Sequence, residues 1–187
     1  MYCCINNAFS FYLLDPAPCD QGIDLGILID RSLSIRRKNV ERLLKGFMPR
    51  FLKQMSVSRK KTHIGIIMYN REAQILAPFN GPKSRSRRRA ISFVKSLDPG
   101  VASLTRTDKG LTLAYSQLFV KKNGDRGKKQ NVLLTFTDGR AYRRKHIKPF
   151  SETVPPLTVG LQVSICFRFQ SVYSVYSVYS PACTKTS

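Results

Sequence analysis

Asp30, Ser32 and Ser34 form a short motif in which one carboxylate and two hydroxyls stand two residues apart. All three are hard oxygen ligands, which suit Mg²⁺, Mn²⁺ or Ca²⁺ better than they suit zinc. The two serines could instead cap the next helix, as serine often does. The motif therefore predicts a cation site only if other oxygen ligands lie close to it in space.

Two other oxygen-bearing side chains, Thr105 and Asp138, stand where such a site requires them. Asp30 and Asp138 each follow a short apolar run, 25–29 and 131–137. Runs of this length, rich in branched side chains, are typical of strands buried on both faces of a parallel sheet. The carboxyl ends of such strands open onto the crevice in which α/β proteins bind ligands. We therefore expect both carboxylates to meet at one rim of a sheet, with the loop at Thr105 over the same edge.

Each of these assignments has a simpler alternative. Thr105 could cap the helix that follows it, which would leave Thr107 as the ligand; we favour Thr105 because it stands first in the pair. Asp138 and Gly139 could form an ordinary turn, although a turn does not explain why two strands end in a carboxylate. Asp108 is interpreted as a favourable charge at the start of its helix. Both histidines are isolated and are not interpreted as ligands.

The apolar pattern alternates between strand and helix, which predicts an α/β fold: a doubly wound, mainly parallel sheet with one antiparallel edge strand. The link between the second and third runs is too short for a crossover, so these strands form a hairpin, and Pro78 places the third strand at the sheet edge. Right-handed crossovers place the first strand centrally. The predicted strands are 23–30, 62–69, 73–79, 131–137 and 157–167, and the predicted helices are about 34–55, 90–97 and 108–120, with Pro49 kinking or splitting the first.

The net charge of the chain is extreme, because 32 Lys and Arg residues face 11 Asp and Glu residues, which gives +21. Such a field attracts polyanions, although scattered, solvated charge is the simpler explanation. Aromatic residues are not interleaved with the basic runs, so a glycosaminoglycan is favoured over nucleic acid. The candidate polyanion contacts lie in the runs 83–89, 121–129 and 140–148 and are Arg85, Arg87, Arg88, Arg89, Lys128, Lys129, Arg143 and Arg144.

The predicted organisation is an N-terminal segment, 1–18, a single domain, 19–168, and a low-complexity tail, 169–187. The first segment is a remnant signal or a linker. The tail holds a Ser-Val-Tyr repeat whose period buries neither a helix face nor a strand face, so we expect it to be unstructured. No apolar run is long enough to span a membrane. None of the five cysteines stands in a Cys-x-x-Cys pair, which argues against zinc.

The motifs together resemble a von Willebrand factor type A domain, also called an integrin inserted-type domain, over about 19–167. The resemblance implies a metal-ion-dependent adhesion site that binds Mg²⁺ (or Mn²⁺ or Ca²⁺) and leaves one coordination position open. An acidic side chain of a matrix or cell-surface protein would fill that position. The metal ligands that it implies are Asp30, Ser32, Ser34, Thr105 and Asp138.

The resemblance also implies an extracellular protein, secreted or part of the cell surface, that performs no chemistry on its ligand. The alternatives are polyanion binding and an intracellular type A subunit of a larger complex. The chain departs from the family where a final strand and a long closing helix are expected, so we interpret it as a fragment or an aberrant gene model of a larger protein. Arg31, Arg106 and Arg140 stand beside the motifs and should weaken metal binding while attracting an acidic partner.

Overall fold

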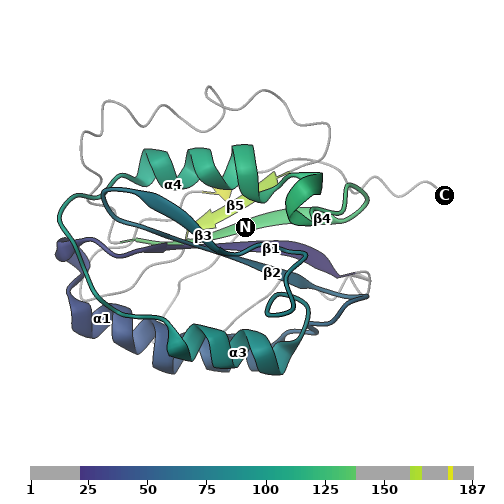
Figure 1. Ribbon diagram of the computed structural model, residues 1–187, viewed down its shortest axis with the longest axis horizontal. Helices are drawn as coiled ribbons and strands as arrows, with labels where there is room; N and C mark the ends of the chain where they lie inside the picture. Colours follow the sequence, from purple (N-terminus) through teal and green to yellow (C-terminus); the bar gives the residue numbers. More distant parts are fainter. Residues whose placement is uncertain (1–21, 138–160, 166–176, 179–187) are drawn as a thin grey trace.

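The computed structural model describes residues 22–137, 161–165 and 177–178, which form a central sheet between two helical layers (Figure 1). The sheet has six strands in the order β3-β2-β1-β4-β5-β6. β3 and β6 are antiparallel to their neighbours at the two edges, and the other strands run parallel. The strands are β1 (Ile23–Asp30), β2 (His63–Tyr69), β3 (Ala73–Ala77), β4 (Gln130–Phe136), β5 (Leu161–Ile165) and β6 (Ser177–Val178).

The central strands are buried on both faces, which explains why their sequences are continuous apolar runs. All seven residues of β2 are buried, as are seven of the eight in β1. Successive side chains point to opposite faces of a strand, so Ile27 packs into the core under one helical layer and Leu28 into the core under the other. The predicted fold class, the central position of the first strand and the antiparallel edge hairpin are confirmed.

The two helical layers come from different parts of the chain (Figure 1). One face is covered by a long helical segment and by α3 (Arg87–Ser96). The other face is covered by α4 (Thr107–Leu113), which continues as the π-helical η3 (Ala114–Leu118) and is followed by the short η4 (Lys121–Asn123). The long segment consists of η1 (Leu33–Ile35), α1 (Arg37–Glu41), the π-helical η2 (Arg42–Phe47) and α2 (Met48–Gln54).

Pro49 is accommodated by a π-helical turn, and the long helical segment continues through it without a break. The residue stands in the first turn of α2, where its missing N–H and its ring would disturb an ordinary α-helix. The turn before it is π-helical, and the Met48 N–H accordingly donates to the carbonyl of Leu43, five residues back. The expected disturbance at Pro49 is therefore present, but the helix continues through it.

The Ser-Val-Tyr repeat departs from the sequence prediction at two residues. Ser177 and Val178 form β6, which pairs antiparallel with Ser164 and Val163 of β5. The expectation of an unstructured repeat is wrong there, because the exposed edge of β5 offers backbone groups that any sequence can pair with. The segment 1–21 and most of the tail lie outside the described residues. No helix of the described part of the chain has the length and apolar character needed to cross a bilayer.

Candidate metal centre

Asp30 is the last residue of β1, and both oxygens of its buried carboxylate accept hydrogen bonds. The backbone N–H of Ser32 donates to Oδ1 at 2.8 Å, and the hydroxyl of Thr137 donates to Oδ2 at 2.7 Å. Thr137 follows directly after β4, which pairs in parallel with β1. Two of the sequence motifs, 107 residues apart, thus meet at the carboxyl rim of the sheet.

The two serines of the first motif lie together at the same rim. Their hydroxyl oxygens are 2.9 Å apart, with Ser32 buried and Ser34 exposed. Ser32 precedes the short helix η1, but its side chain makes no capping hydrogen bond, and Ser34 lies inside that helix. Ser32 thus stands at the N-cap position of η1, as the simpler alternative expects, but its hydroxyl makes no capping hydrogen bond and lies next to that of Ser34.

Backbone hydrogen bonds hold the loop that carries Thr105 against the loop that carries Ser32. The N–H of Leu33 donates to the carbonyl of Ala102 at 3.1 Å, and the N–H of Ala102 donates to the carbonyl of Arg31 at 3.0 Å. Thr105 itself is buried. Its loop thus lies over the same rim, as the sequence predicts.

Thr105 does not cap the helix that follows its loop. α4 begins at Thr107, its N-cap residue is Arg106, and no side chain makes a capping hydrogen bond there. The N–H of Arg106 instead donates to the carbonyl of Asn70, just after β2, at 2.8 Å. The alternative that treats Thr105 as a helix cap is therefore wrong.

Tyr69 is a residue at this rim that sequence reasoning missed. It ends β2, pairs in register with Asp30, and its fully buried hydroxyl lies 3.2 Å from that of Thr107. Burial and then the charge of Asp30 raise the pKa of Tyr69 well above 10, so its hydroxyl stays neutral. The signal that could have found Tyr69 is its position at the end of a strand beside β1.

Asp138, the fifth proposed ligand, lies outside the described residues, as do Arg140, Arg143 and Arg144. The described part of the chain contains no group of three or more His, Cys, Asp or Glu side chains that could hold a metal ion. Hydroxyls and one carboxylate are therefore the donors that the described residues bring to the rim. Such donors suit a hard cation.

Arg106, one of the cations expected to weaken metal binding, is held by a carboxylate. Its guanidinium donates to both oxygens of Asp108, with the shortest contact at 2.6 Å. The hydrogen bond from Arg106 lowers the pKa of Asp108, which therefore stays ionised at neutral pH. The positive charge beside the Thr105 loop is thus largely compensated.

A second buried polar cluster lies at the opposite, amino rim of the sheet and has a structural role. The fully buried carboxylate of Asp24 accepts hydrogen bonds from Nε and Nη2 of Arg126, at 2.9 and 2.7 Å, and from its backbone N–H at 2.8 Å. His63 lies beside Asp24, and its Nε2 is 3.1 Å from the carbonyl of Arg59. These contacts join β1, β2 and the loop before β4.

Comparisons with known proteins match this fold. The family model for the von Willebrand factor type A domain matches residues 24–161. Matrilin-1 of Gallus gallus is 29% identical over 120 residues, which are 64% of this chain and 23% of the relative. Integrin alpha-M of Mus musculus is 31% identical over 123 residues, or 65% of this chain and 10% of the relative. Vitrin of Homo sapiens is 27% identical over 124 residues, or 66% and 17%. The chain thus spans less than a quarter of each relative.

Solved structures show the same fold at lower sequence identity. Proximal thread matrix protein 1 from the mussel byssus, with a zinc-occupied MIDAS motif, superposes with a TM-score of 0.65 at 19% identity, covering 79% of this chain and 38% of that one. Manganese-loaded TRAP protein of Plasmodium vivax gives a TM-score of 0.64 at 20% identity, covering 79% and 58%. The family model covers most of the chain and the fold agrees with it, so this chain belongs to the von Willebrand factor type A domain family.

Proposed function

We propose that this chain is an extracellular adhesion or matrix-binding domain that binds a protein ligand through a divalent cation. The observation that carries the proposal is the contact between Thr137 and Asp30, because it brings the ends of β1 and β4 together at one rim. Asp138 is the next residue along the chain after Thr137. The residues that would hold the cation are Asp30, Ser32, Ser34, Thr105 and Asp138.

The spacing of the two serine hydroxyls fits a small hard cation. Oxygens on adjacent corners of an octahedral Mg²⁺ site, each about 2.05 Å from the metal, are about 2.9 Å apart. The hydroxyl oxygens of Ser32 and Ser34 are already 2.9 Å apart. Neighbouring oxygens around Ca²⁺, at about 2.3–2.6 Å from the metal and often five in one plane, lie at a similar separation. The hydrogen-bonded pair is therefore spaced to bind one hard cation, Mg²⁺, Mn²⁺ or Ca²⁺.

The donor set leaves the cation with an affinity for a further carboxylate. Asp30 and Asp138 are the two carboxylates among the five proposed ligands, and five donors leave one position of a six-coordinate cation open. The bound cation supplies a focus of positive charge for an acidic side chain of the partner protein. Two proteins of the same fold carry metal in their solved structures, zinc in the mussel thread protein and manganese in the Plasmodium protein.

The chain's own residues prepare the site for this role. The N–H of Ser32 and the hydroxyl of Thr137 fix the orientation of the Asp30 carboxylate. The neutral hydroxyl of Tyr69 is hydrogen-bonded to the hydroxyl of Thr107. This contact supports Thr105, rather than Thr107, as the threonine that binds the metal. We propose that such a site binds its partner protein and catalyses no reaction. The domain that carries it is proposed to span residues 19–168.

Calorimetric titration with Mg²⁺ tests the metal site directly. We expect saturable heat with the wild-type chain and its loss in Ser32→Ala. Ser103→Ala is the matched control, because Ser103 is an exposed serine on the adjacent loop and should bind Mg²⁺ normally. Circular dichroism verifies that all three proteins are folded. A folded wild-type chain that gives no heat with Mg²⁺ or Mn²⁺ would overturn the proposal.

A second measurement tests the acidic partner. A triple-helical collagen-like peptide with one exposed glutamate should bind in Mg²⁺ and be released by EDTA. The same peptide with glutamine at that position should not bind, since the amide cannot replace a carboxylate on the metal. Equal binding of the two peptides would exclude a carboxylate–metal contact.

A further inference from the structure

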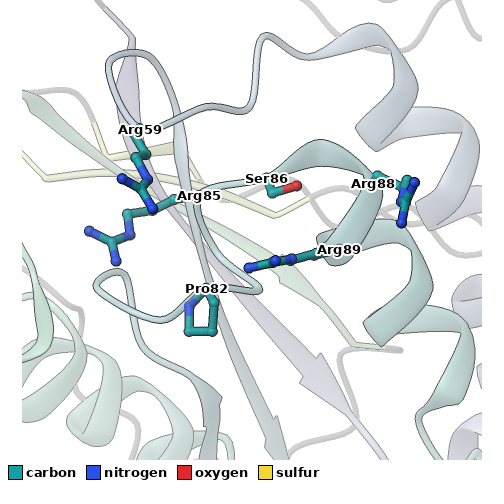
Figure 2. Close-up of a pocket in the computed structure, with 6 residues that line it drawn as sticks. All are labelled: Arg59, Pro82, Arg85, Ser86, Arg88 and Arg89. Carbon is teal, nitrogen blue, oxygen red and sulfur yellow. The ribbon is translucent and has the colours of Figure 1, made fainter.

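Two adjoining hollows lined by arginines lie beside the start of α3, and together they are named the arginine groove here. The first has a volume of about 390 Å³, and the second, of about 470 Å³, shares Arg85, Ser86 and Arg88 with it. The first hollow is lined by Arg59, Pro82, Arg85, Ser86, Arg88 and Arg89 (Figure 2). In Figure 2, Arg59 and Arg85 lie on one side of Ser86 and Arg88 lies on the other. Guanidinium groups thus border the groove on both sides of this serine.

The positive charge of the groove is not compensated by the described carboxylates, whose ion pairs are made with other cations. None of the ion pairs in the described part of the chain includes an arginine of the first hollow. The Nε of Arg85 is buried and has no hydrogen-bond partner there. The pairs that do form are Glu41 with Lys45, Glu72 with Lys109, Asp98 with Arg37, Asp108 with Arg106 and Asp24 with Arg126.

The start of α3 adds to this positive field. Arg87, Arg88 and Arg89 occupy the first turn, which contains no acidic residue, and Ser86 at the N-cap makes no side-chain capping hydrogen bond. Cations destabilise a helix at this end, where the helix dipole is positive and free N–H groups point outward. The Nη1 of Arg87 donates a hydrogen bond to the carbonyl of Lys53 at 3.3 Å. An anion in the groove would relieve the charge repulsion among the arginines at the start of α3.

We propose that the arginine groove binds a sulfated glycan chain. Two hollows that share a wall suit an extended polymer with repeating anionic groups better than they suit one small ion. The planar fork of arginine donates paired hydrogen bonds to oxyanions. Among the residues that the structure describes, no aromatic side chain lines either hollow, so this lining lacks the stacking surfaces with which proteins bind single-stranded nucleic acid.

The groove is distinct from the proposed metal centre. β3 runs antiparallel to β2, so the chain returns to the amino rim of the sheet before α3 begins. The carbonyl of Ser84 accepts a hydrogen bond from the N–H of Ile64, at the start of β2, at 2.9 Å. The groove therefore lies at the opposite end of β2 from Tyr69, and its binding does not require a metal.

The test is fluorescence titration with a short heparin oligosaccharide at physiological ionic strength. The variant Arg88→Ala/Arg89→Ala removes two exposed charges from the groove. Lys38→Ala/Arg42→Ala is the control, since it removes two exposed charges from α1 and η2, which line neither hollow. We expect the groove variant to lose at least about tenfold in affinity and the control variant about twofold or less. EDTA should change neither value.

Several outcomes would overturn the proposal. Equal losses in both double variants would mean that the net charge alone attracts the glycan. Equally tight binding of single-stranded DNA of the same charge, lost with the same arginines, would assign the groove to nucleic acid. Displacement of the oligosaccharide by inorganic sulfate at equal sulfate concentration would indicate a site for a single anion. Arg59 also lines the first hollow but lies outside α3. Arg59→Ala should therefore weaken glycan binding even if Arg88→Ala/Arg89→Ala fails to fold.

Discussion

The hydroxyl of Thr137 donates a 2.7 Å hydrogen bond to the carboxylate of Asp30, although 107 residues separate them. The contact exists because β1 and β4 are parallel neighbours and end at the same rim. Thr137 therefore satisfies a buried charge and also aligns the segment that leads to Asp138. Stability and metal affinity should both depend on this hydroxyl.

Thr137→Val should destabilise the chain by about 1–3 kcal/mol, because it removes the hydroxyl that donates to the buried Asp30 carboxylate. Thr135→Val is a matched control on the same strand: Thr135 is fully buried, and its hydroxyl has no hydrogen-bond partner among the described residues. That change should be neutral or stabilising. Urea unfolding of both variants measures the difference. Equal losses would mean that the Thr137 hydrogen bond contributes no specific stability.

Arg126→Met should be strongly destabilising, by about 3–5 kcal/mol, because it leaves the fully buried Asp24 carboxylate without its ion pair. Arg126→Lys keeps the charge but lacks the forked geometry that reaches Asp24 through two nitrogens. We expect it to lie between wild type and the methionine variant. Chemical denaturation at neutral pH distinguishes the three proteins, and a methionine variant as stable as wild type would contradict this role.

His63 should make the fold less stable as the pH falls below about 6.5. Burial, together with the charges of Arg126 and Arg85, lowers the pKa of His63, and the Arg59 carbonyl and Asp24 only partly oppose this. The unfolded chain takes up the proton at about pH 6.5, before the folded chain does, so acid favours unfolding. The loss is at most about 1.4 kcal/mol per pH unit.

The measurement is the free energy of unfolding of wild type and His63→Gln between neutral pH and about pH 5. The glutamine variant cannot take up this proton, so its curve should be flatter over that range. Parallel curves for the two proteins would show that His63 titrates alike in the folded and unfolded states.

Gly26 and Gly65, register partners on β1 and β2, leave room for the side chains of the α4 layer. An added Cβ at Gly65 would lie 2.9 Å from atoms of Leu118 and Phe79. Gly65→Ala should therefore cost about 1–3 kcal/mol by overpacking. Gly46→Ala is the contrasting variant: an added Cβ meets nothing within 4 Å in its helical segment, and it should stabilise by up to about 1 kcal/mol. Thermal unfolding of both variants shows whether each substitution raises or lowers the stability of the chain.

Much of this architecture could be predicted from the sequence, because β1 and β2 are buried on both faces and read as unbroken apolar runs. The short link to β3 fixed the hairpin, and the carboxylate that ends β1 indicated the functional rim. The π-helical turns could not be predicted, since an α-helix and a π-helix bury similar apolar stripes. β6 was missed because it depends on the backbone edge of a neighbouring strand and not on side-chain periodicity.

The candidate site was predicted in outline but not in its contacts. Spacing alone could not tell that Ser32 takes an N-cap position without a capping hydrogen bond, or that Arg106 and not Thr105 is the N-cap residue of α4. Thr137 belongs to the motif that contains Asp138 but was not predicted as a ligand, and Tyr69 was not singled out, because an aromatic residue at the end of a buried strand is common in any core. Asp138 lies outside the described residues and remains a prediction.

The reversed direction of β3 has a consequence for how the domain could work within a matrix. It separates the start of α3 from the rim at Asp30 by the length of the sheet, which is about 26 Å for the eight residues of β1. An acidic protein and a sulfated polymer could therefore occupy the domain simultaneously without steric conflict. A single copy could then crosslink two different components, and where those components are already joined to each other the two contacts would reinforce each other by avidity.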